Sequence, residues 1–351
     1  MYCLQSSDQV LLWMGEQKNP VKHDRSNDHV LDSAISYYKD KNPKLPYDVG
    51  ELFLDNGAFT ANMQNIELDL QKVIQIQEKL DPSKTIPYDY PFKNGLSSSQ
   101  MEQRWKKTAK NIQYWQTSTS LTGRLVPALH AWNKDSLKKN LNWLQKHGDS
   151  DYLAVGSVVT SKFTEETGFF GDRQPNKSLI DMLSLTIESV KTETDYNIHL
   201  MGLGSSPLTL HLGYYLGIES TDSAGYRRKA AYGQIVLPGT GERYAGNNTA
   251  KFGGGTYFKK KDMKKLRECT CPICKINQDQ LWNDWKARAI HNDYVMKNER
   301  KLAEKLIKDG QEAYEKHLNS IYKASSLNYL WEYAKLKKKY NGISSVLFGR
   351  K

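Results

Sequence analysis

Residues 197–222 read NIHLMGLGSSPLTLHLGYYLGIESTD, and this stretch decides the fold class. A β-like run at 197–202 is followed by a helical stretch at 207–215, and a second β-like run follows at 217–222. Strands that alternate with helices along a chain are typical of parallel βαβ units. The stretch therefore predicts two parallel strands joined by a crossover helix.

The same alternation extends outward over residues 50 to 240. Further β-like runs lie at 51–55, 86–89, 124–130, 152–156 and 234–238. Amphipathic stretches lie between them, near 65–80, 99–117, 134–147 and 177–192. These seven strands, with one more from the N-terminal segment, would close an eight-stranded barrel. We expect an α/β protein with a (β/α)8 TIM-type barrel, and a doubly wound open sheet is the competing architecture.

The C-terminal ends of the predicted strands carry acids, a histidine and glycines. They are Asp55, Asp89, His130, Gly156, Gly202, Gly204 and Asp222. In a parallel barrel the C-terminal ends of the strands converge on one face, and that face carries the active site. Each aspartate could instead cap the next helix, although none is followed immediately by a helical pattern.

Asp55 and Asp222 are the strongest candidates for a catalytic pair. Two carboxylates at a glycosidic carbon can act as nucleophile and as general acid/base. Two aspartates also suit metal binding or proton transfer, so the pair alone does not identify sugar chemistry.

A cysteine cluster gives the strongest local signal. The run Cys269-Thr-Cys-Pro-Ile-Cys274 is followed 17 residues later by His291. Three thiolates and one imidazole make a closed tetrahedral site, so Cys269, Cys271, Cys274 and His291 predict one structural Zn2+. Four cysteines in 351 residues argue against a disulfide scaffold and favour a reducing compartment. We expect Cys3 to be an ordinary thiol.

The positive charge is concentrated toward the C-terminus. The net charge is +11, whereas residues 251–267 and 296–351 together carry +13. Nucleic acid is a natural partner for such a patch, and ordinary solvated helix faces are the alternative. The chain has no apolar run of the roughly 18 residues that a membrane helix needs, and its first residues lack the pattern of a secretion signal. We therefore expect a cytoplasmic protein without a membrane partner.

These observations predict three regions. Residues 1–248 would form the catalytic barrel, residues 249–295 the zinc-binding subdomain, and residues 296–351 a basic helical C-terminal segment.

Four segments together resemble the tRNA-guanine transglycosylases. They are Asp55-Asn-Gly-Ala-Phe59, Leu153-Ala-Val-Gly-Ser157, Met201-Gly-Leu-Gly-Ser-Ser-Pro207 and the cysteine run that ends in His291-Asn292. The resemblance covers about residues 50 to 295 in the correct order. Each barrel motif is weak alone, but the ordered set with the zinc signature is specific.

The resemblance implies a role for each strand-end residue. Asp222 would attack C1′ of a guanosine nucleotide and expel guanine, and Asp55 would act as general acid/base. Asp89 would bind the Watson–Crick edge of the base, and Gly156 would offer backbone groups. Phe59 and Met201 would sandwich the base, although core packing is their simpler explanation. The implied substrate-binding set is Asp89, Phe59, His130, Gly156, Met201 and Gly202.

Several positions depart from the tRNA enzymes. Asp222 is followed by Ser-Ala-Gly-Tyr-Arg-Arg-Lys229 and not by a path toward Pro-Thr-Arg. Asn56 and His130 also differ, since glutamine is usual where His130 stands. We expect no room for the RNA-binding C-terminal domains of the archaeal enzymes. These features look more like the DpdA-type DNA-guanine transglycosylases of bacterial and phage DNA-modification systems.

We therefore expect a pentosyltransferase that exchanges guanine in DNA for a free 7-deazaguanine base such as preQ0, in a bacterial or phage-infected host cytoplasm. Base exchange in tRNA is the alternative, and a non-catalytic nucleic-acid-binding barrel subunit is a third hypothesis. We also consider a homodimer. The residues expected to contact nucleic acid are Arg227, Arg228, Lys229, Lys259, Lys260 and Lys261.

Overall fold

The computed structural model describes residues 9–93, 95–156, 175–245, 256–323 and 325–340. These residues divide into two compact units. The first unit comprises residues 15–201 and 333–340, and the second comprises residues 9–14 and 202–332. The predicted region boundary at residue 248 lies outside the described residues, and the division into three regions stays a prediction.

The first unit contains six parallel strands in chain order. β2 (Asp24–Ser33), β3 (Asp48–Asp55) and β4 (Lys84–Thr85) pair in parallel. β5 (Ala128–Leu129), β6 (Tyr152–Val155) and β7 (Asn197–Leu200) form a second parallel set. A parallel bridge between Thr85 and Leu125 connects the two sets. A doubly wound sheet would reverse this order at a switch point, so the order argues against an open sheet.

A contact across the strands shows that this sheet is curled. The rings of Phe53 in β3 and His199 in β7 meet edge-on with centroids 4.9 Å apart. Three strands separate β3 from β7 in the strand order, so a flat sheet would hold β3 and β7 about 19 Å apart. The two side chains therefore meet in the interior around which the strands curve. Leu52, Phe53 and Leu54 are all buried, as expected for a strand covered on both faces.

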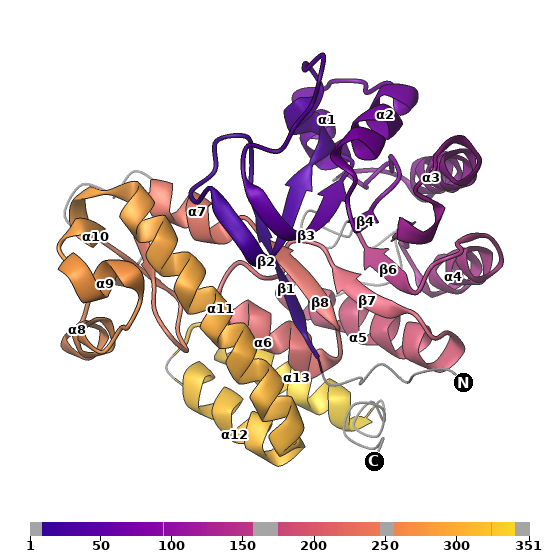
Figure 1. The fold of residues 1–351 in the computed structure, drawn as a ribbon. Coiled ribbons are helices and arrows are strands. Elements are labelled where there is room, and N and C mark those ends of the chain that lie inside the picture. Colours follow the sequence, from indigo (N-terminus) through magenta and orange to yellow (C-terminus); the bar gives the residue numbers. More distant parts are fainter. Residues whose placement is uncertain (1–8, 94, 157–174, 246–255, 324, 341–351) are drawn as a thin grey trace, which may run out of the picture. The chain divides into compact units, whose positions relative to one another are not determined.

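Helices connect these strands and lie outside them (Figure 1). They are η1 (Ala34–Tyr37), α1 (Ala58–Gln64), α2 (Leu70–Leu80), α3 (Ser98–Ser118), η2 (Thr122–Arg124), α4 (Lys134–His147) and α5 (Pro175–Glu193). Local polar residues fix where they begin. Ser97 and Asn133 accept hydrogen bonds from the amides of Gln100 and Ser136 in capping boxes at α3 and α4. Asp69 caps α2 in the same way.

The second unit contains the last barrel strand, most of the first one and most of the later helices. β1 (Leu11–Gly15) pairs in parallel with β8 (Ser220–Ser223). The other elements are α6 (Pro207–Leu216), α7 (Gly225–Ala231), β9 (Gln234–Val236), β10 (Glu242–Tyr244), β11 (Thr256–Tyr257), α8 (Lys260–Arg267), α9 (Pro272–Asn277), α10 (Gln280–Asn283), α11 (Trp285–Asp309) and α12 (Gln311–Tyr322). The long α11 packs against α6, α7 and α12 (Figure 1). The division between the units falls within α13 (Asn328–Tyr340).

Eight parallel strands that alternate with helices confirm the predicted α/β fold of (β/α)8 type. The prediction of individual strands was wrong in three places. The strand expected at 86–89 lies instead at residues 84–85, as β4. Residues 234–238 do not supply a barrel strand, because β9 pairs with β10, the central strand of a separate three-stranded sheet that also contains β11. The N-terminal segment supplies two barrel strands, β1 and β2, where one was expected. Among the described residues, no helix combines the length and the apolar character that crossing a bilayer requires.

Candidate active site and metal centre

Asp222 lies on β8 and its orientation is fixed by the loop that follows residue 201. The amide of Gly202 donates to Asp222 Oδ1 over 2.6 Å, and the amide of Gly204 donates to the Asp222 carbonyl over 3.1 Å. Gly202 has a φ of +75°, which favours glycine. The loop therefore presents one backbone donor to the carboxylate, which is half-buried, and a second to the Asp222 backbone. A carboxylate held in this way keeps one orientation, as a nucleophile requires.

Asp55 ends β3 in the first unit and is also held by neighbours. Its Oδ2 accepts hydrogen bonds from Ser33 Oγ at 3.2 Å and from the Gly57 amide at 3.0 Å. Ser33 is the register partner of Asp55 on β2. Gly57 has a φ of +85°, and a Cβ there would lie 2.5 Å from the Ile35 Cβ. The glycine in the Asp55 motif is thus required by close packing as well as by backbone conformation.

Asp89 lies at the centre of a buried polar chain. Its Oδ1 accepts from Asn56 Nδ2 at 2.9 Å, and its Oδ2 lies 2.7 Å from His130 Nε2. Asn56 also donates to the Pro87 carbonyl, and Asn140 donates to the His130 carbonyl. The structure thus brings two of the predicted residues, Asp89 and His130, into direct contact.

Gly156 closes this cluster from β6. A Cβ at Gly156 would lie 2.5 Å from His130 Cε1, so the imidazole lies directly against the glycine backbone. His130 has no exposed surface, and Phe92 packs on its ring with centroids 5.3 Å apart. His130 therefore has a single position in the site, set by packing on its sides and by Asp89 at its edge.

The two residues expected to sandwich a base differ in exposure. The Phe59 side chain is 50% exposed on α1, whereas Met201 is half-buried after β7. Core packing would have buried Phe59, so this simpler explanation does not hold for Phe59. Met63 and Ile66 are exposed close to it in the sequence.

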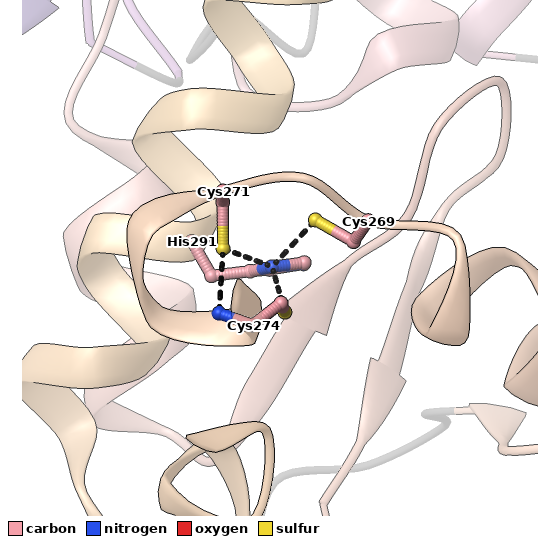
Figure 2. A group of neighbouring side chains, drawn as sticks. All are labelled: Cys269, Cys271, Cys274 and His291. Atoms are coloured by element: carbon pink, nitrogen blue, oxygen red, sulfur yellow. Dashed lines mark hydrogen bonds between the residues drawn. The ribbon is translucent and has the colours of Figure 1, made fainter. Parts of the chain in front are cut away.

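The three cysteines and His291 converge in the second unit (Figure 2). His291 Nδ1 lies 3.5, 3.4 and 3.4 Å from the sulfur atoms of Cys269, Cys271 and Cys274. A tetrahedral zinc ion, with bonds of about 2.3 Å to sulfur and 2.0 to 2.1 Å to nitrogen, would hold these atoms about 3.6 Å apart. The cluster therefore fits a metal ion such as zinc.

Neighbouring groups orient the ring of His291. Its Nε2 lies 2.9 Å from the Val236 carbonyl, which leaves Nδ1 to face the sulfurs. Asn292 donates to the Tyr226 and Gln234 carbonyls and accepts from the Val236 amide. The His-Asn pair thus attaches α11 to β9 and fixes the metal cluster at the start of that helix.

The residues expected to contact nucleic acid differ in accessibility. Arg228, Lys259, Lys260 and Lys261 are exposed. Lys229 is half-buried and forms a 2.8 Å ion pair with Glu242, while Arg227 is 9% exposed. Residues 251–255 and 341–351 of the basic stretches lie outside the described residues.

Sequence reasoning missed three functional candidates, Ser33, Asn56 and Arg243. Asn56 was noted only as a departure from the family, although its place beside Asp55 was a usable signal. Ser33 could not be found from the sequence, because its role depends on strand register. Arg243 pairs with Asp262 at 2.9 Å and lies beside the predicted Lys229 and Lys261 around one cavity.

A (β/α)8 protein with carboxylates at its strand ends and a Cys3His metal cluster is therefore the class that fold and site define. Residues 55–324 match the family described as queuine tRNA-ribosyltransferase, and the chain belongs to this family. A tRNA-guanine(15) transglycosylase of Methanosarcina mazei is 22% identical over 289 residues. That alignment covers 79% of this chain and 52% of the archaeal protein, so the chain spans about half the length of this relative.

Proposed function

We propose that this protein is a guanine transglycosylase that exchanges a guanine base in a nucleic acid through a covalent intermediate on Asp222. The observation that carries the proposal is the carboxylate of Asp222, held at a barrel strand end by the amide of Gly202. Family membership supports the same chemistry. A non-catalytic barrel is disfavoured, because both catalytic aspartates are present and hydrogen-bonded in fixed orientations.

In the proposed first step, a carboxylate oxygen of Asp222 bonds to C1′ of the target nucleotide. The C1′–N9 bond breaks, its electron pair goes to N9, and Asp55 as general acid supplies the proton that makes the departing guanine neutral. In the second step, Asp55 removes the N9 proton of the incoming base, N9 bonds to C1′, and the ester to Asp222 breaks. Both aspartates return to their starting states.

Asp89 is proposed to recognise the base. Its two oxygens are oriented by Asn56 and His130, so the carboxylate presents a fixed edge to the N1–H and N2–H donors of guanine. Gly156 lets a base approach the backbone, and Phe59 and Met201 would stack on the two faces of the base.

We propose DNA as the polymer and a 7-deazaguanine such as preQ0 as the incoming base. The segment Ser223 to Lys229, which departs most from the tRNA enzymes, supports DNA. The name of the family and that of the archaeal relative support tRNA, which is therefore the second candidate. In either case we propose that Cys269, Cys271, Cys274 and His291 hold a structural zinc ion, which would stabilise the fold and take no part in the exchange.

The test is an exchange assay with labelled guanine or preQ0 and either DNA or tRNA. The wild-type protein should incorporate label, and omission of the free base should leave a denaturant-resistant adduct with the polymer. Asp222→Asn should lower incorporation at least about 1,000-fold and abolish the adduct. Asp309→Asn, an exposed substitution at the end of α11, is the matched control and should behave as wild type. Near-normal turnover by Asp222→Asn would remove the proposed mechanism.

A further inference from the structure

A polar cavity of about 690 Å³ lies within the second unit. Its walls come from the start of α6, from α7, from the turn between β9 and β10, from α8, from residues 320–321 in α12 and from residues 325–327. The motifs that led to the proposed chemistry do not explain this cavity, although three of the expected basic residues, Lys229, Lys259 and Lys261, line it.

The charge of the lining is strongly positive. Five cationic side chains line the cavity, and they are Lys229, Arg243, Lys259, Lys261 and Lys265. Among the described lining residues two are carboxylates, Glu242 and Asp262, and these pair with Lys229 and Arg243. Burial lowers the pKa of Lys265, whose ammonium group donates to the Pro238 carbonyl. The lining therefore carries three more cations than anions, and an anionic ligand would be attracted to it.

The neutral part of the lining consists largely of hydroxyl groups. Those side chains are Ser205, Ser206, Thr240, Ser320, Ser325 and Ser326. None of the described lining residues is aromatic, so this cavity is unsuited to stacking a base. Lysines and hydroxyls are the groups that bind phosphate oxygens in protein–nucleic acid complexes.

The cavity begins at the loop that holds Asp222. Gly202 and Gly204 donate to Asp222, and Ser205 at the cavity wall is the next residue. A Cβ at Gly225, three residues after Asp222, would lie 3.0 Å from Ser205 Cα, so the two loops are in close contact. A group bound in the cavity would therefore touch the segment that orients the proposed nucleophile.

We propose that this cavity binds a backbone phosphate of the nucleic acid strand next to the exchanged nucleotide. The inference rests on the proposed function, since it identifies where the polymer is held when Asp222 acts. Lys261 and Lys265 supply charge to the phosphate oxygens, and the serine hydroxyls supply directed hydrogen bonds. The two ion pairs, Lys229–Glu242 and Arg243–Asp262, keep the walls in place.

The test compares two lysines on α8. Lys261 and Lys264 are both exposed, but only Lys261 lines the cavity. Binding of a short single-stranded DNA with one guanine is measured by fluorescence anisotropy over a range of salt concentrations. Lys261→Ala should weaken binding about three- to tenfold at low salt and reduce the slope of log K against log salt by about 1. Lys264→Ala should leave both quantities close to wild type.

Neutral methylphosphonate links, introduced one at a time, locate the phosphate. One position should weaken wild-type binding and cause no further loss in Lys261→Ala, as expected for two groups that contact each other. The proposal is overturned if the two lysine variants behave alike, or if every methylphosphonate position weakens Lys261→Ala as much as wild type. It is also overturned if inorganic pyrophosphate binds in a Lys261-dependent manner while DNA affinity is unchanged, since the cavity would then hold a free anion.

The two proposals fail separately. Retention of exchange by Asp222→Asn would refute the proposed mechanism, and the Lys261 binding result would stand. Normal Asp222-dependent exchange with no Lys261 effect on binding would refute the phosphate site alone.

Discussion

Asp32 is a buried acid next to Ser33, the residue that donates a hydrogen bond to Asp55. Its Oδ2 accepts from Tyr37 and Tyr47 at 2.7 Å each, and its Oδ1 accepts from the Ser33 amide. Burial raises the pKa of Asp32 to about 6, although these hydrogen bonds oppose the rise. Ser33 Oγ donates to Asp55, so Ser33 links Asp32 to the proposed acid/base residue. We expect the ionisation of Asp32 to affect how Ser33 holds Asp55.

Asp32 should make stability depend on pH. Its pKa is raised in the folded state, so between pH 3.8 and about 6 the folded state binds more protons than the unfolded state. The stability that Asp32 contributes is present at low pH and is lost as the pH rises through 6. The free energy of unfolding falls by about 3 kcal/mol over this range. Urea unfolding of Asp32→Asn and wild type at pH 4.5 and 7.5 checks this. The variant should gain stability relative to wild type at the higher pH, and an unchanged difference would contradict the assignment.

His130 should control how well Asp89 recognises the base. His130→Leu removes the hydrogen bond to Asp89 Oδ2 and leaves a buried carboxylate oxygen without that partner, at a cost of about 1 to 3 kcal/mol. We expect kcat/KM for the incoming base to fall about 10- to 100-fold. His130→Gln is the matched control, because its amide can donate to the same oxygen. Steady-state exchange kinetics distinguish the two, and equal losses would argue that His130 only fills space.

At the scale of elements, a metal ion bound by Cys269, Cys271, Cys274 and His291 would hold together short helices that have little core of their own. The surrounding apolar cluster includes Ile235, Leu237, Leu266, Leu281 and Ala287. Such short elements rarely persist without a ligand, and structural zinc in small peptides contributes about 10 to 16 kcal/mol. The cluster is therefore expected to stabilise residues 256–292 as one piece.

Metal analysis should find about one zinc per chain, as the four-ligand rule requires. Cys271→Ser should lose the metal, whereas Cys3→Ser should keep it. Removal of the metal by a strong chelator should raise hydrogen exchange in residues 256–292 and leave strands β2 to β7 protected. A folded, metal-free wild-type protein would contradict the zinc assignment.

Prolines and glycines explain where strand predictions succeeded and failed. β6, β7 and the helices between the barrel strands were predicted closely, because their apolar residues form clear runs or periodic faces. β4 and β5 are only two residues long, since Pro87 and Pro127 lack the amide donor that a longer ladder needs. The turn Pro238-Gly-Thr-Gly241 directs β9 into an antiparallel hairpin with β10, away from the barrel.

The N-terminal strands were harder to predict for a different reason. β2 reads DRSNDHVLDS, which has too few apolar residues to be recognised as a barrel strand. The candidate site shows the same limit. The strand ends predicted four site residues one by one, namely Asp55, Asp89, His130 and Asp222. The hydrogen-bond chain from Asn56 through Asp89 to His130 could not be predicted, because it depends on side-chain orientations in segments 33 and 41 residues apart.

At the scale of the whole molecule, the excess positive charge is expected to dominate affinity for the polymer. Each phosphate contact releases counterions, so the association constant should fall steeply as salt rises. Six contacts would lower affinity about 1,000-fold between 50 and 200 mM salt. Titration of single-stranded DNA and of tRNA over this range should give slopes of similar size, because both polymers present phosphates. A flat salt dependence would contradict a role for the basic stretches.

Charge cannot select the polymer, so selection must come from the 2′-hydroxyl and from backbone shape near Asp222. The segment after Asp222 is closely packed, since Ser223 Oγ accepts from the Gly225 amide and Gly225 lies against Ser205. A DNA enzyme must also take its guanine out of the stack, at a cost of a few kcal/mol that is smallest for unpaired bases.

We therefore predict that exchange is fastest in single-stranded DNA, slower at a mismatched guanine and slowest in a perfect duplex. The measurement is uptake of labelled guanine or preQ0 at matched salt, with an unmodified tRNA transcript as the fourth substrate. Because unstacking precedes attack by Asp222, the rates should differ by the cost of freeing the base, and about 1.4 kcal/mol corresponds to a factor of ten. Label that enters tRNA but none of the three DNA substrates would reverse the choice of polymer while leaving the chemistry of Asp222 intact.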